Sequence, residues 1–183
     1  MKPLFPTPGA GYDQPFEMLG ACHDRVRRSL DLLQRLQAHL IEHGADAQAR
    51  DAARDVLRYF DLAAPKHHAD EEIHVFPALL AADAAAHGTL IERLQDEHRR
   101  MEAAWPAARL QLQAVADGRW QVDGADAAAA AWACFAGLYD AHMAAEDQIV
   151  YPAARSLFDA AALATMGGEM AARRGLTAVN TGP

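Results

Sequence analysis

The chain has 183 residues, 51% of them hydrophobic and 23% charged, which fits a single domain with a buried core. Its formal net charge of −8 argues against the basic surfaces that bind nucleic acids and anionic membranes, so we expect neither partner. The two cysteines, Cys22 and Cys134, are too few for a disulfide framework and indicate the reducing cytoplasm.

The first half of the chain predicts two helices after an irregular leader. Prolines and glycines oppose regular structure in residues 1–14, which also lack the apolar core of a secretory signal. A helical pattern of apolar residues begins at Pro15 and ends near Gly44. Asp46 is then a good N-cap for a second helix over residues 47–82, which Pro65 is expected to kink.

The second half predicts two further long helices and a short one. Thr89 and Glu92 form a capping box for the third helix, which follows the break "DAAAHGT" and runs to about Val115. Asp123 or Asp126 caps the fourth helix, and a short helix is expected near "FDAAALATMGGEMAARRG". The longest apolar run, "AAAAAWACFAGLY", is too short to span a bilayer.

These elements predict an all-α protein. Strand signals are almost absent, and four long amphipathic helices with short connections favour an up-down-up-down four-helix bundle. We therefore expect a leader over residues 1–14, a bundle over residues 15–158, and a short helix with a tail over residues 159–183.

A repeated motif carries the chemistry of the sequence. The segment "HHADEEIHVFPA" (residues 67–78) aligns without gaps with "HMAAEDQIVYPA" (residues 142–153), and both contain His-x-x-x-Glu followed by Val-aromatic-Pro. Side chains four residues apart on a helix point to one place, so His67 pairs with Glu71 and His142 with Glu146. Imidazole and carboxylate suit iron, manganese or zinc, and one carboxylate can bridge two cations. The repeat therefore predicts a two-metal site.

The position of these polar residues on their helices supports the metal site. Phe135, His142, Glu146 and Ile149 share the apolar face of the fourth helix, where an unpaired charge is costly to bury. A single histidine on such a face is more often a satisfied core residue than a ligand. Every helix of the predicted bundle carries one, however, including His23 on the first helix and His98 on the third.

The order H…HxxxE…H…HxxxE resembles that of the hemerythrin-like family, also called HHE cation-binding domains, over roughly residues 15–158. The resemblance implies a four-helix bundle that holds two non-heme irons, bridged by carboxylates and a solvent-derived oxo or hydroxo group. It implies six ligands: His23, His67, Glu71, His98, His142 and Glu146. Oxygen-carrying hemerythrins have a further histidine on the third helix, where this chain has Leu94 or Glu102 one turn from His98.

Three further residues have open roles near the predicted site. His68 adjoins His67 but points about 100° away around the helix, so we expect it beside the ligands rather than among them. Glu102 is expected on the inner side of the third helix, as a seventh ligand or a salt-bridge partner. Tyr139 lies three residues before His142, where it either hydrogen-bonds the site or packs in the core.

Three functions remain open at this point, and no residue is assigned as catalytic. The first is a metal-binding protein whose diiron centre binds, senses or stores dioxygen, nitric oxide or peroxide. The second is a diiron oxidoreductase that decomposes peroxide or reduces nitric oxide. The third is a bundle with a structural metal and a partner-binding role. We expect a small diatomic molecule or peroxide as ligand, and leave a homodimer open.

Overall fold

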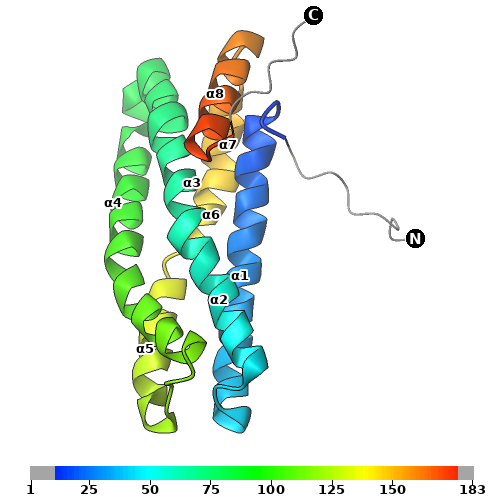
Figure 1. The fold of residues 1–183 in the computed structure, drawn as a ribbon. Coiled ribbons are helices and arrows are strands. Elements are labelled where there is room, and N and C mark those ends of the chain that lie inside the picture. The colour runs from blue at the N-terminus through cyan, green and yellow to red at the C-terminus, as the bar shows by residue number, and fades with distance from the viewer. Residues whose placement is uncertain (1–10, 177–183) are drawn as a thin grey trace, which may run out of the picture.

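The computed structural model describes residues 11–176, and within them every regular element is helical (Figure 1). The predicted leader and tail therefore lie largely outside the described residues. The elements in chain order are α1 (Pro15–His43), α2 (Ala47–Leu62), α3 (Ala64–Asp70), η1 (Glu71–Val75), α4 (Phe76–Ala116), η2 (Val122–Gly124), α5 (Ala125–Ala136), α6 (Asp140–Ala145), η3 (Glu146–Val150), α7 (Tyr151–Arg155) and α8 (Ala160–Arg173). Segments η1 and η3 are π-helical, and η2 is a 3₁₀ turn.

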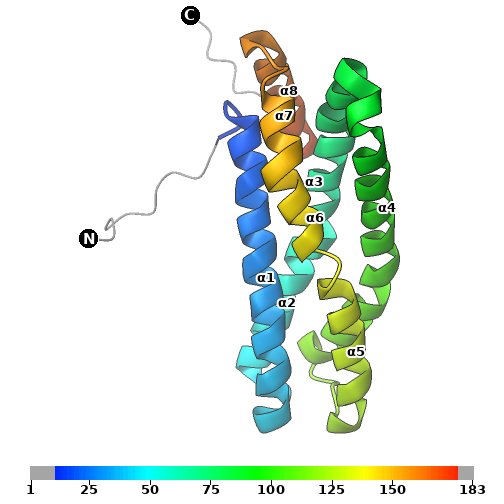
Figure 2. The ribbon, with the colours of Figure 1, turned by 180° about the vertical axis from the view of Figure 1, so that it is seen from behind.

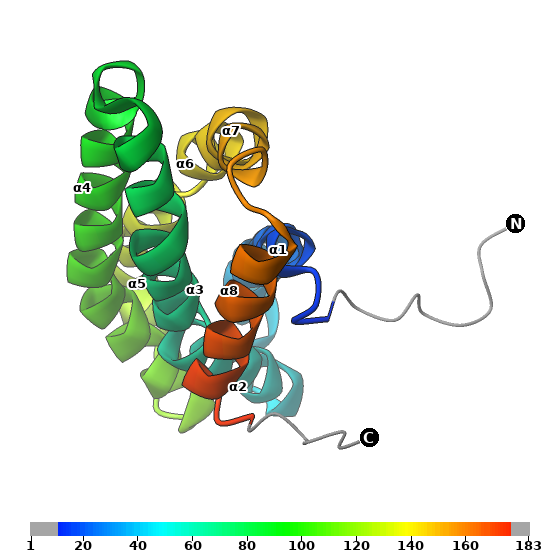
Figure 3. The same ribbon diagram turned by 90° about the horizontal axis from the view of Figure 1, so that it is seen from above.

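These elements form four long bundle helices that lie side by side (Figures 1 and 2). Bundle helix 1 is α1, and bundle helix 2 comprises α2, α3, η1 and the first turns of α4. Bundle helix 3 is the remainder of α4, and bundle helix 4 comprises α5, α6, η3 and α7. The additional helix α8 lies beside α1 and α3 at one end of the bundle (Figure 3).

The core consists of two apolar clusters. One cluster contains Leu40, Phe60, Leu112 and Trp132, towards the end where α1 and α2 connect. The other contains residues of α1, α4, α7 and α8 at the opposite end. Along each bundle helix, buried polar side chains lie where the residues of one apolar cluster end and those of the other begin. They are His23, His67, His68, Asp70, Glu71, His98, His142 and Glu146. The fold therefore holds a polar layer inside an apolar bundle.

Both ends of the second helix agree with the sequence, because it begins at Ala47 and its helical backbone breaks at Asp83. Gly44 has a positive φ of 70° at the end of α1, and Asp46 accepts a hydrogen bond from the N–H of Ala49 at 2.8 Å. Pro65 lies in the first turn of α3, immediately after a break at Ala63, so the expected kink is present. The π-helical segment η1 was not expected, because nothing in the spacing of the apolar residues marks it.

The capping box at Thr89 is wrong. Bundle helix 3 begins at Asp83, whose backbone is non-helical and whose carboxylate accepts from the N–H of Ala86 at 2.9 Å. This cap supplies an acceptor that the alanine-rich segment around it lacks. Thr89 then lies inside α4, because an exposed helix tolerates the small cost of a glycine and a β-branched residue.

The fourth helix also differs from its prediction. It is interrupted between α5 and α6 rather than continuous, and neither Asp123 nor Asp126 caps α5, whose N-cap is Gly124. The expected inner residue Ile149 is 51% exposed, whereas Val150 is 1% exposed. The π segment η3 contains one residue more than an α-turn, so the buried face moves one position along the chain.

No helix within residues 11–176 is long and apolar enough to cross a membrane.

Candidate metal centre

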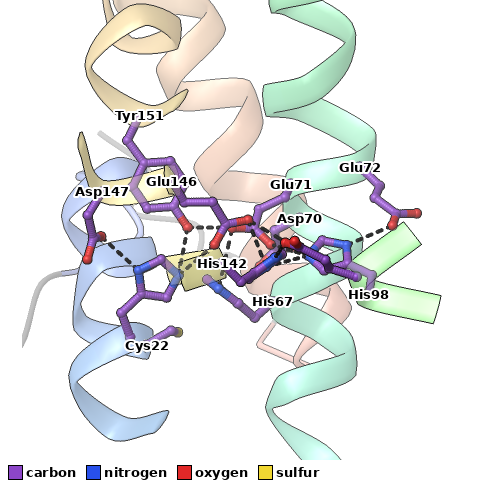
Figure 4. Close-up of polar contacts among 12 residues, drawn as sticks. Cys22, His67, Asp70, Glu71, Glu72, His98, His142, Glu146, Asp147 and Tyr151 are labelled. Atoms are coloured by element: carbon purple, nitrogen blue, oxygen red, sulfur yellow. Dashed lines mark hydrogen bonds and ion pairs between the residues drawn. The ribbon is translucent and has the colours of Figure 1, made fainter. Parts of the chain in front are cut away.

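The six residues of the repeated pattern meet in the polar layer, although they come from all four bundle helices (Figure 4). They form two groups, in each of which the donor atoms lie within 4.8 Å of one another. One group is His23, His67, Glu71 and Glu146, and the other is His98, His142 and Glu146. None of the six is more than 3% exposed. The side chains therefore form one buried cluster, with Glu146 common to both groups.

Each glutamate spans the two groups with its two oxygens. Glu146 places Oε2 at 3.1 Å from Nε2 of His23 and Oε1 at 3.1 Å from Nε2 of His142. Glu71 places Oε1 at 3.4 Å from Nε2 of His67 and Oε2 at 3.5 Å from Nε2 of His98. This is the arrangement that two bridging carboxylates require.

Acidic side chains outside the cluster orient three of the imidazoles. Nδ1 of His23 lies 2.7 Å from Asp147, and Nδ1 of His98 lies 2.8 Å from Glu72 (Figure 4). Nδ1 of His142 lies 2.9 Å from Glu97. A carboxylate accepts the Nδ1 proton, which leaves the Nε2 lone pair directed inward, as in metal sites whose histidines are held by outer acids.

The same contacts provide a test of whether metal ions fit. With the proton on Nδ1, each Nε2 lone pair faces a carboxylate lone pair at little more than 3 Å, an arrangement that repels unless a proton or cation lies between them. Glu71 Oε2 and both carboxylate oxygens of Glu146 are buried without hydrogen-bond partners. A buried unpartnered carboxylate is costly, and cations between these donors remove that cost. The residues present therefore fit bound metal ions.

Burial and mutual contact shift the ionisation of the cluster. Burial raises the pKa of Glu71 well above its usual value, and the neighbouring Glu146 carboxylate adds to this rise. Burial alone would also raise the pKa of Glu146, but the adjacent imidazoles of His142, His23 and His98 outweigh it and hold this pKa well below its usual value. Burial and nearby histidines lower the pKa of His67 well below its usual value. The pKa values of the two carboxyl groups in the metal-free cluster are thus shifted in opposite directions.

Tyr151 was missed by the sequence analysis. Its hydroxyl donates a hydrogen bond to Oε1 of Glu71 and lies 3.1 Å from Nε2 of His23, on which its ring stacks at 5.3 Å (Figure 4). Burial and the adjacent carboxylates raise its pKa well above the usual value, so the hydroxyl keeps its proton. The repeat contained a signal, because Tyr151 aligns with Phe76, which stacks on His98 at 5.8 Å.

The structure shows where the three residues with open roles lie. Tyr139 is buried among Phe60 and Phe135, which fits core packing, and the hydroxyl group at the cluster is that of Tyr151 instead. Glu102 is exposed and belongs to neither group, rather than lying on the inner side, because Met101 takes the buried position. His68 belongs to neither group but is buried, and it stacks on His98 with ring centroids 3.9 Å apart.

A buried ion pair fixes α8 to the helix that carries the first His-x-x-x-Glu. Asp70, which directly precedes Glu71, is fully buried and lies 2.9 Å from Nη1 of Arg173 and 2.7 Å from Nη2 of Arg174. The backbone of Tyr12 approaches Gly167 so closely that any side chain there would collide with it. Helix α8 is therefore part of the structure that supports the cluster.

The fold and the cluster define a helical-bundle protein whose buried histidines and glutamates can hold metal ions. The family model of the hemerythrin HHE cation binding domain matches residues 14–154. The chain therefore belongs to this family, as its sequence resemblance indicated. It is also similar to an uncharacterized protein of Haemophilus influenzae, at 33% identity over 175 residues, which covers 95% of this chain and 98% of that protein.

Proposed function

We propose that this protein holds two non-heme iron ions between the six side chains of the cluster and that the pair interacts with dioxygen, nitric oxide or peroxide. The observation that carries the proposal is the placement of the glutamates. Each directs its two oxygens to histidines of different groups, which is a donor arrangement for two cations rather than one. The up-down-up-down order of the bundle helices and a cytoplasmic location belong to the same proposal.

The residues divide between the two ions. His23 and His67 would hold one iron, His98 and His142 the other, and Glu71 and Glu146 would bridge both. When bound, the iron pair supplies reversible exchange of electrons with small oxygen- and nitrogen-containing ligands. Four histidines and two carboxylates would supply the protein's ligands to this iron pair.

The rest of the chain prepares the cluster for that chemistry. Asp147, Glu72 and Glu97 fix the direction of three imidazoles through their Nδ1 atoms. The two apolar clusters above and below the polar layer exclude bulk water and lower the local dielectric constant. Because its hydroxyl donates to Glu71, Tyr151 holds a proton next to the bridging carboxylate.

The metal content of anaerobically purified protein tests this proposal. We expect two irons per chain and, on exposure to air, a visible charge-transfer band of an oxo-bridged ferric pair. A matched variant, Glu102→Gln, changes an exposed acid of α4 and should leave both the iron content and the visible band unchanged. One zinc per chain, with no coloured species after reconstitution with ferrous iron, would contradict the proposal and favour a structural metal.

Tyr151 favours a second candidate function, a diiron oxidoreductase that decomposes peroxide or reduces nitric oxide. Reduction of two nitric oxide molecules to nitrous oxide and water consumes two protons and two electrons, which an external reductant must supply, and decomposition of peroxide moves protons between its oxygens. The Tyr151 hydroxyl is a buried hydrogen-bond donor in contact with two residues of the cluster, where it can orient such proton transfer. We expect iron-loaded protein to turn over peroxide and Tyr151→Phe to slow turnover while keeping two irons per chain. Stoichiometric binding of peroxide or nitric oxide without turnover would support the binding function instead.

A further inference from the structure

Two small cavities lie end to end beside the cluster. The outer one has a volume of about 40 Å³ and opens at the surface near Glu102 and Trp105. The inner one, of about 10 Å³, is bounded by His23, His67 and His142. Three residues line both cavities: Ala64, His68 and Tyr139. The two spaces are therefore separated by a partition of three side chains.

His68 is the unusual member of this partition. It is 93% buried, since only 7% of its surface is exposed, and its Nδ1 is buried without any hydrogen-bond partner. Its ring stacks on His98 at 3.9 Å with an interplanar angle of 11°. No hydrogen bond therefore fixes Nδ1, and an unpartnered buried nitrogen carries a cost that calls for a functional reason.

The repeat places His68 in only one half of the cluster. Its counterpart in the second half is Met143, which is 2% exposed and lines the inner cavity. Methionine fills such a position without any polar group to satisfy. The fold accommodates an apolar side chain at the equivalent place, so a histidine at position 68 is not needed for packing.

The cavity volumes indicate that the partition must move. A cavity holds one water molecule only above about 10–15 Å³ on this measure. The outer cavity exceeds that limit, whereas the inner one, at about 10 Å³, lies only at its lower end. A diatomic molecule therefore fits in the outer cavity but reaches the ligand histidines only if a lining side chain shifts.

We propose that small neutral molecules reach the cluster through the outer cavity and that His68 is the gate between this cavity and the metal-binding histidines. The outer cavity is walled mainly by Phe60, Met101, Trp105 and Phe135, and so favours uncharged molecules such as dioxygen and nitric oxide. Rotation of the His68 ring away from His98 joins the two spaces. His68 then acts as a positioning residue that controls the rate of access rather than the affinity.

This proposal rests on the proposed function for its ligand, but its first test does not need iron. Crystals of metal-free protein pressurised with xenon locate apolar paths directly, because xenon occupies dry cavities. We expect xenon in the outer cavity of the wild type and a second xenon beside His67 and His142 in His68→Ala. Adding Ala64→Val to His68→Ala narrows the partition from the other side and should remove the second xenon. Absence of xenon from the outer cavity of the wild type would refute the path.

The second test measures dioxygen association with the ferrous protein by stopped flow. We expect His68→Ala to raise both association and dissociation rates about tenfold, because the stacking with His98 no longer has to be broken, and to leave the affinity nearly unchanged. His68→Phe, which keeps an aromatic ring against His98, should retain wild-type rates, and His74→Ala, outside both cavities, should not alter them.

The outcomes separate the gate from the metal centre. Unchanged rates in His68→Ala, or an altered affinity with constant association rate, would overturn the gate. Loss of iron from His68→Ala would make His68 a ligand and would also overturn it. Failure of the wild type to bind two irons would refute the proposed function, and the xenon positions would still decide whether the path exists.

Discussion

Removal of the Asp70 carboxylate tests the role of α8 in supporting the cluster. Both of its oxygens are buried and paired, one with Arg173 of α8 at 2.9 Å and the other with the C-cap residue Arg174 at 2.7 Å. Deleting one partner of a buried ion pair costs about 3–5 kcal/mol, because the remaining charges lose their compensation. Arg173 and Arg174 are 21% and 16% exposed and can partly regain water, so the lower end of this range applies to Asp70→Ala.

The assay is urea unfolding of metal-free protein, so that metal binding does not contribute. We expect Asp70→Ala to lower the free energy of unfolding by about 3 kcal/mol, which for a chain of this size lowers the melting temperature by about 6–12 °C. Amide hydrogen exchange should increase first in α8. The control is Asp55→Ala, because Asp55 forms an exposed pair with Arg58 at 2.9 Å that contributes at most about 0.5 kcal/mol. Equal losses of unfolding free energy in the two variants would refute a stabilising role for the buried Asp70 ion pairs.

Three further predictions concern the cluster itself. The double variant His67→Ala/His142→Ala should abolish stoichiometric metal binding, measured by elemental analysis, and retention of two metals per chain would show that the ligands are others. Glu97→Gln should weaken metal affinity about 10–100-fold in a chelator competition while leaving two sites, because it loosens the His142 imidazole without removing it. Stability of the metal-free protein should fall as the pH drops below about 6.5, because the unfolded chain then binds protons at His67 and His68 that the buried side chains do not. The raised pKa values of Glu71 and His142 oppose this trend, so urea midpoints that rise steadily from pH 8 to pH 5.5 would mean that these two groups dominate.

The repeat predicted much of the fold and of the cluster because its information is local. A spacing of four places His67 near Glu71 and His142 near Glu146 on any α-helix, and the apolar stripes decide which way these pairs face. The family resemblance covered the same helices and the same six residues. Whether those residues bind iron remains a prediction from both arguments.

The features that were missed depend on contacts between distant residues. Glu97 reaches His142 across 45 positions of the sequence, and Tyr151 reaches Glu71 across 80. No spacing rule along one helix predicts such pairs, which require the relative rotation of two bundle helices. The partition formed by Ala64, His68 and Tyr139 also appears only when α3 is packed against the turn that precedes α6.

The two π-helical segments determine where bundle helices 2 and 4 can lose a single residue without a change in their buried faces. Each follows the same point of the repeat, beginning at Glu71 and Glu146, and each carries an exposed isoleucine, Ile73 or Ile149. A π segment accommodates one surplus residue, so the helical turns before and after it still present the same residues to the core. Excision of that isoleucine should therefore restore an unbroken α-helical ladder without turning Val75 or Val150 out of the core. Loss of one residue elsewhere in these helices would rotate everything beyond it by about 100°.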